Sequence, residues 1–85
     1  MSLEDGWSNI LKQIKNNYPR RKIKEKEDRV EVRFNPSTLL IIEKGGFVEG
    51  SMPLHHFQVE NAEEVTVENN ITIVRGDNFE YMFKK

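Results

Sequence analysis

The sequence contains no cysteine and no long apolar run, and these two absences exclude several classes of protein. Without cysteine there can be no disulfide and no thiolate metal site, which favours an intracellular protein over a small secreted one. No apolar run approaches the roughly 20 residues that span a bilayer, and the N-terminus lacks a basic-then-apolar leader. We therefore expect a soluble, cytoplasmic protein with no membrane partner.

The chain has 85 residues and is predicted to form a single domain over residues 1–85, because a second hydrophobic core does not fit in this length. Apolar residues make up only 36% of it, and a core this small is often completed by a partner or by further copies of the chain. We expect no enzymatic activity and no cofactor, because nucleophile turns, phosphate-cradling glycine loops and zinc-ligand spacings are all missing.

The net charge of −1 conceals an uneven distribution of charge along the chain. Up to Lys26 there are seven lysines and arginines and three acidic residues, a net charge of +4, so the remainder carries −5. We describe residues 19–28 as a basic arm. Such an arm can hold nucleic-acid phosphates, whereas a solvated edge strand rich in lysine would instead guard against aggregation. The candidate phosphate-binding residues of the arm are Arg20, Arg21, Lys22 and Lys24.

Residues 6–17 are predicted to form an amphipathic helix, because apolar residues recur there at helical spacing. Either Asp5 or Ser8 can cap its start, and Pro19 ends it because the residue before proline avoids helical geometry. The apolar stripe must pack against something, so we interpret its aromatic members as core residues and not as base-stacking rings. The stripe consists of Trp7, Ile10, Leu11, Ile14 and Tyr18.

Strand patterns dominate residues 29–84. Apolar and charged residues alternate over 29–34, as in a strand with one solvated face. Residues 35–37 then form a turn, and the segment 39–42 is expected in the middle of a sheet because both of its faces are apolar. Lys44-Gly45-Gly46 supplies the positive φ angles of a tight hairpin turn, after which the chain returns.

A further hairpin is expected at residues 65–73, and its side chains favour one register. A three-residue loop sets Val67 opposite Ile71 and pairs like residues with like, whereas a two-residue loop would set Val67 opposite Thr72. We therefore predict the longer loop. Its last residue, Asn70, would take the left-handed conformation that asparagine tolerates.

Another hairpin is predicted at residues 71–81, where an apolar strand runs into Arg75-Gly76-Asp77-Asn78 and continues as a second strand. This order resembles the second sequence motif of the Sm and Sm-like (Lsm) proteins, in which it builds part of an RNA-binding pore. The resemblance implies that Arg75, Gly76 and Asn78 bind RNA, and a guanidinium can both stack on a base and bond to a phosphate. A surface arginine in a salt bridge beside a tight turn is the alternative.

The first Sm motif is also matched in part, and Gly50 stands where a strand can bend sharply. The resemblance implies a mostly β fold with one N-terminal helix and a strongly bent antiparallel sheet that forms an Sm-like open barrel. It further implies a homo-oligomeric ring, in which strand 79–84 of one copy extends the sheet of the next. The matching positions of the first motif are Leu40, Ile42, Gly45, Val48 and Gly50.

The chain departs from the Sm pattern in two places. About twenty extra residues separate the helix from the first Sm strand, and only four residues stand between Met52 and Phe57, about four fewer than the family loop needs. That loop carries the aspartate and asparagine that bind a base, so half of the usual pocket is missing, and His56 is a possible replacement. We expect weak, salt-sensitive binding of single-stranded RNA through Arg75 and the basic arm.

A second family offers an alternative. Residues 42–46 and Pro53-Leu54 also suit a pleckstrin-homology-like domain, or another α+β meander, which would be a protein-interaction or scaffold domain with no role in RNA binding. Pleckstrin-like domains normally close with a C-terminal helix, whereas this sequence ends in a strand pattern. The pair His55-His56 does not predict a metal site, because neighbours on a strand point to opposite faces and no third ligand is suitably spaced.

Overall fold

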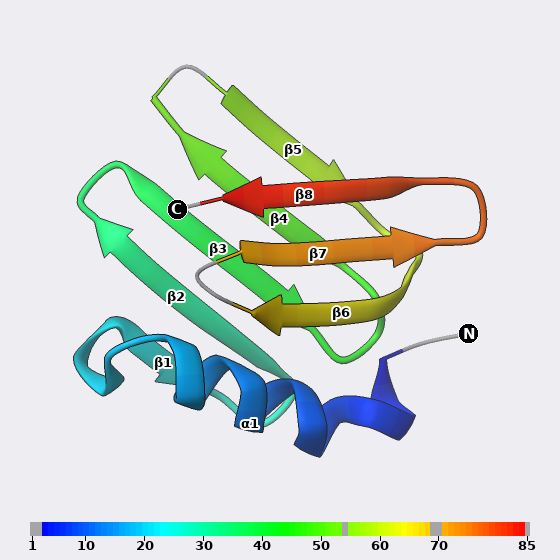
Figure 1. Ribbon diagram of the computed structural model, residues 1–85, viewed down its shortest axis with the longest axis horizontal. Helices are drawn as coiled ribbons and strands as arrows, with labels where there is room; N and C mark the ends of the chain where they lie inside the picture. The colour runs from blue at the N-terminus through cyan, green and yellow to red at the C-terminus, as the bar shows by residue number, and fades with distance from the viewer. Residues whose placement is uncertain (1–2, 54, 69–70, 85) are drawn as a thin grey trace.

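The computed structural model describes residues 3–53, 55–68 and 71–84, which form one α-helix and two antiparallel sheets (Figure 1). One sheet has five strands in the order β1-β2-β3-β4-β5, and the other has three in the order β6-β7-β8. Within each sheet, every strand pairs with its neighbours in sequence. The elements are η1 Glu4–Gly6, α1 Trp7–Asn17, η2 Arg20–Lys22, β1 Ile23–Glu25, β2 Arg29–Asn35, β3 Thr38–Glu43, β4 Val48–Met52, β5 His55–Val59, β6 Ala62–Glu68, β7 Ile71–Gly76 and β8 Glu80–Lys84.

The helix α1 confirms the prediction for residues 6–17, apart from its cap. Gly6 stands at the N-cap without a side-chain cap, and Ser8 lies inside the helix, so the expected capping by Ser8 is wrong, whereas the side chain of Asp5 lies outside the described residues. The helix ends as predicted, with Tyr18 in an extended conformation before Pro19. The predicted stripe faces the core: Trp7, Ile10, Ile14 and Tyr18 are buried, and Leu11 packs against them half-buried.

In the five-stranded sheet, β2 shows the alternation of buried apolar and solvent-facing charged residues that the sequence predicted. Val30, Val32 and Phe34 of β2 are buried between charged neighbours, and β3 lies at the centre of the sheet as expected. The turn after β2 is closed by Asn35, whose Oδ1 accepts a 2.9 Å hydrogen bond from the Ser37 backbone N–H. The tight turn after β3 is confirmed as well, and Gly46 has a φ of 112°.

Part of the basic arm predicted at 19–28 belongs to the sheet. Residues 20–22 form η2, and residues 23–25 form β1, in which Ile23 pairs with Val32 and Glu25 with Val30. The sheet therefore begins at Ile23, six residues before the predicted start at residue 29. Its position at the end of the strand order makes β1 an edge strand, which is the alternative that the charge pattern left open.

The register between β6 and β7 differs from the prediction. Val67 pairs with Thr72 and Glu68 with Ile71, so two residues and not three connect the strands. This register places Thr72 on the buried face, where its Oγ1 lies 3.1 Å from the Tyr18 hydroxyl. A satisfied hydroxyl can be buried at little cost, so pairing like residues with like was the wrong criterion. The conformation predicted for Asn70 lies outside the described residues.

The described residues form two sheets and no closed barrel, so the expected single bent sheet is replaced by two layers. The chain changes sheets after β5, at a turn where the Ala62 N–H donates a 2.9 Å hydrogen bond to the Gly46 carbonyl. A Cβ on Gly46 would lie 3.1 Å from the Ala62 carbonyl oxygen, so the close approach requires glycine there. In Figure 1, β7 and β8 cross over the strands of the other sheet, and α1 runs beside β6.

Candidate interaction surfaces

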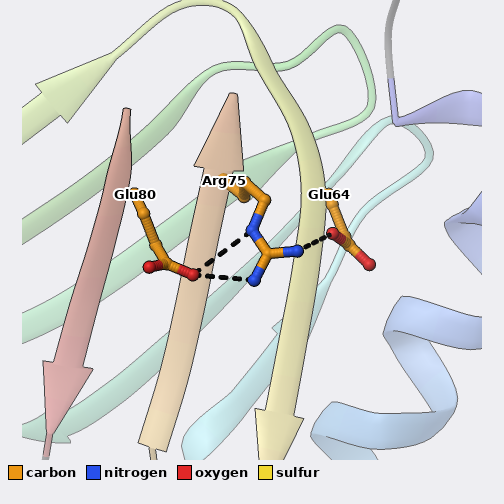
Figure 2. Close-up of polar contacts among 3 residues, drawn as sticks. All are labelled: Glu64, Arg75 and Glu80. Carbon is orange, nitrogen blue, oxygen red and sulfur yellow. Dashed lines mark hydrogen bonds and ion pairs between the residues drawn. The ribbon is translucent and has the colours of Figure 1, made fainter. Parts of the chain in front are cut away.

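Arg75 lies between two carboxylates on the solvent-facing side of the three-stranded sheet (Figure 2). Its Nη1 is 3.1 Å from Glu64 Oε1 on β6, and its Nη2 is 2.7 Å from Glu80 Oε2 on β8. Its Nε also donates to the same Glu80 oxygen, at 3.2 Å. The hydrogen bond and charge of Glu80, followed by the charge of Glu64, raise the pKa of Arg75. The structure thus displays the salt-bridge alternative for this arginine, and its role in an RNA pore stays a prediction.

The other residues of the predicted pore serve a turn or lie on the other sheet. The Gly76 N–H donates a 2.9 Å hydrogen bond to the Phe79 carbonyl, and a Cβ on Gly76 would overlap the Phe79 ring. Asn78 is exposed in the same turn. His56 is on β5, exposed on the outer side of the five-stranded sheet, with its Nε2 2.8 Å from Glu49 Oε2. The structure therefore brings Arg75, Gly76 and Asn78 together, but not His56.

The remaining four candidates, Arg20, Arg21, Lys22 and Lys24, are named here the basic segment. Within the described part of the chain, none of their side chains makes a hydrogen bond or ion pair. The arginine side chains elsewhere do: Arg29 lies 3.0 Å from Glu31, and Arg33 donates to the Pro36 carbonyl at 3.3 Å.

Beside the basic segment is a hollow of about 130 Å³, lined by Lys15, Arg20 and Ile23. The Lys15 ammonium is 2.8 Å from Glu25, so one of the two cations at the hollow is already paired. The basic segment and the β7–β8 turn lie at opposite sides of the molecule in Figure 1. The predicted RNA-binding residues therefore lie in three separate places, which are the β7–β8 turn region, the basic segment and His56 on β5. Of the predicted cations, Arg75 is paired, and those of the basic segment have no partner among the described residues.

The helix occupies the free edge of β6. Gln13 Oε1 accepts a 2.8 Å hydrogen bond from the Val67 N–H, and Asn17 Nδ2 donates to the Val67 carbonyl at 3.3 Å. Both backbone groups that Val67 would offer to another strand are thereby used. The spacing of Gln13 and Asn17, four residues apart beside the apolar stripe, was the sequence signal for this contact, and the predictions from sequence did not include it.

The edge of β8 has no such cover among the described residues. Gly76 and Phe79 form the hydrogen-bonded pair that closes the β7–β8 turn, and hydrogen-bonded and non-hydrogen-bonded pairs alternate along antiparallel strands. The backbone N–H and C=O groups of Glu80, Met82 and Lys84 therefore point away from β7. We call this row the β8 edge, and β8 stands last in the strand order of its sheet.

An exposed apolar side chain lies next to the β8 edge. Thr66, Ile73 and Met82 stand opposite one another across the outer face of the three strands. Met82 is the most exposed large apolar side chain of the described residues, at 59%. On the inner face, the Tyr81 ring stacks on Phe57 of β5, with centroids 3.8 Å apart, so this stack joins the two sheets. In the described residues, the β8 edge thus combines unpaired backbone groups with the exposed Met82 side chain beside the half-buried Ile73.

Comparisons with protein-family models, with curated proteins and with solved structures find no match to this chain. The Sm-like and pleckstrin-like resemblances therefore stay predictions. Among the described residues, no three acidic or histidine side chains are grouped to hold a metal ion. No helix in the same residues is long and apolar enough to cross a membrane.

Proposed function

We propose that the chain is a small protein-interaction domain of the pleckstrin-homology-like type, which binds its partner by adding a strand to β8. The observation that carries this proposal is the difference between the two edges of the three-stranded sheet. At the β6 edge, Gln13 and Asn17 bond both backbone groups of Val67, whereas no side chain of the described residues bonds to the β8 edge. A strand added to an open edge gains backbone hydrogen bonds, and pockets for alternate side chains give it specificity.

The arrangement of the sheets supports the same family alternative. Two stacked sheets with one helix along an edge suit a pleckstrin-like domain better than a single bent sheet would. The helix is N-terminal here, and it lies beside β6 in place of the C-terminal helix expected for that family. The side chain that fits best as an anchor for a partner is Met82, because it is exposed, apolar and flexible.

A proline at position 82 provides a test that separates the edge from the fold. Met82→Pro removes an N–H that points away from β7, so the pairing with β7 keeps its hydrogen bonds. Met82→Val is the matched control, since it changes the side chain and keeps the N–H. Peptides selected from a displayed random library on the wild-type protein should bind Met82→Val and lose binding to Met82→Pro. Selected peptides that bind all three proteins equally would exclude strand addition at β8.

Binding of single-stranded RNA through the basic segment is a second candidate, and one observation favours it. The four cations of that segment have no partner in the described residues, whereas Arg75 is already held by Glu64 and Glu80. Unpaired cations gain most from contacts with phosphates, which are largely independent of base identity. Such binding would be weak and salt-sensitive, and it would not require a pore.

A further inference from the structure

We infer that the strand added to β8 is β8 of a second copy of this chain, running antiparallel and centred on Met82. The inference rests on the proposed function, because it names the partner of the same edge. It would join two three-stranded sheets into one sheet of six strands. The order would be β6-β7-β8 of one copy followed by β8-β7-β6 of the other.

The direction of the backbone groups restricts the possible registers. Two copies related by a two-fold axis at Met82 would exchange hydrogen bonds between the two Met82 residues, whose N–H and C=O groups both face outward. The same axis sets Glu80 opposite Lys84 of the second copy, and Tyr81 opposite its Phe83. An axis at Tyr81 would instead set Glu80 opposite Met82 and leave both charges without a complement. The sequence Glu-Tyr-Met-Phe-Lys of residues 80–84 is thus self-complementary in charge when it is centred on Met82.

The Met82-centred register also extends two rows that already cross the three-stranded sheet. Glu64, Arg75 and Glu80 alternate in charge across β6, β7 and β8 (Figure 2), and the register sets position 84 of the second copy, a lysine, next to Glu80 at the end of that row. The apolar row through Ile73 and Met82 would meet its own symmetry mate. The most exposed large apolar side chain would then lie next to another apolar side chain at the centre of the joined sheet.

The closure of the joined sheet predicts two copies and not a larger ring. In a two-fold arrangement each copy uses the same surface, so the association ends after one step. Both outer edges of the six-stranded sheet would be β6, and the Val67 backbone groups on each of those edges are already bonded to Gln13 and Asn17. The dimer would therefore cover the β8 edge of both copies and leave as outer edges two β6 strands that the helix already contacts at Val67.

The charge pairs allow a test by mixing. Lys84→Glu sets two glutamates opposite each other at each end of the pair, and Glu80→Lys sets two lysines there. Each variant alone should raise the Kd of the dimer by about tenfold or more. A one-to-one mixture should restore association, because each Glu80→Lys chain then faces glutamates at both positions. Light scattering after size exclusion gives the mass, and far-ultraviolet circular dichroism checks that each variant is folded.

The expected masses are two chains for the wild-type protein, one chain for either variant at the same concentration, and two chains for the mixture. A wild-type monomer at all concentrations would overturn the inference, as would a dimer that neither substitution weakens or a mixture that stays monomeric. A mass of five to eight chains would also overturn it, in favour of an Sm-like ring. If the wild type is a monomer but its selected peptides fail on Met82→Pro, the dimer is wrong and strand addition stands. If both tests fail, the proposed function is wrong too.

Discussion

The Tyr18 hydroxyl and Thr72 Oγ1 lie 3.1 Å apart in the core, and either group can donate the hydrogen bond between them. Tyr18 follows the end of α1, and Thr72 is on β7, so this contact joins the helix to the second strand of the three-stranded sheet. Both residues are buried, and every buried polar side-chain atom of the described residues has a partner. The pair therefore links the position of the helix to the register of the sheet.

Replacing Tyr18 by phenylalanine should destabilise the fold, because it leaves the Thr72 hydroxyl buried without its partner. We expect the free energy of unfolding to fall by about 1–3 kcal/mol. Urea denaturation measures the change. The double variant Tyr18→Phe with Thr72→Val should recover much of the loss, since both polar groups are then absent. A single variant as stable as the wild type would show that the hydrogen bond contributes little.

Tyr18 should also make stability depend on pH in the alkaline range. Burial raises its pKa above the ordinary value of 10.0, with an opposing contribution from the Thr72 hydrogen bond. The folded protein therefore keeps this proton at a pH where the unfolded chain has lost it, so the stability is full below pH 10.0 and falls as the pH rises through the raised pKa. Tyr18→Phe should lack this part of the decline. Equal alkaline slopes for the two proteins in urea titrations would contradict the assignment.

Truncating Ile10 to alanine tests whether the helix is docked. Ile10 is buried on the apolar stripe of α1, and large-to-small changes at such sites cost about 2–5 kcal/mol. Asn9→Ala is the control, because Asn9 is exposed on the same helix. Thermal and urea denaturation should show a large loss for the first variant and almost none for the second. Similar small changes in both would mean that α1 does not pack against β6.

RNA binding should depend on the basic segment more than on Arg75. Neutralising Arg20 and Arg21 together should reduce binding of labelled oligouridine and oligoadenosine alike. In a plot of the logarithm of the binding constant against the logarithm of the salt concentration, the slope should become shallower by about one for each phosphate contact that is lost. Arg75→Ala should have a smaller effect, because Glu64 and Glu80 already hold the guanidinium. Fluorescence anisotropy at low salt measures both.

Two results of that titration would change the interpretation. Absence of binding to either oligonucleotide would remove the second candidate function. Tight binding of oligouridine alone, abolished in Arg75→Ala, would instead support the Sm-like pore and its candidate residues Arg75, Gly76 and Asn78.

The sequence by itself determined the elements whose signal is local. The spacing of Trp7, Ile10 and Ile14 predicted α1 almost to the residue, and the alternation at 29–34 predicted β2 with its buried face. The hairpin turn at Arg75–Asn78 was predicted as well. Periodicity of this kind reports which side of an element avoids water, and that depends only on neighbours along the chain.

Only the tertiary structure decided what each element faces. The observed β6–β7 register brings Thr72 to Tyr18, which is 54 residues away in the sequence. Gln13 and Val67 are also 54 residues apart, and the Gln13 side chain accepts a hydrogen bond from the Val67 N–H. A hydrogen bond between Ala62 and Gly46 joins the two sheets where the chain passes from one to the other, and the partners of Arg75 come from two other strands. The local sequence around each of these side chains does not specify its hydrogen-bond partner. The partner is selected only when the whole fold packs.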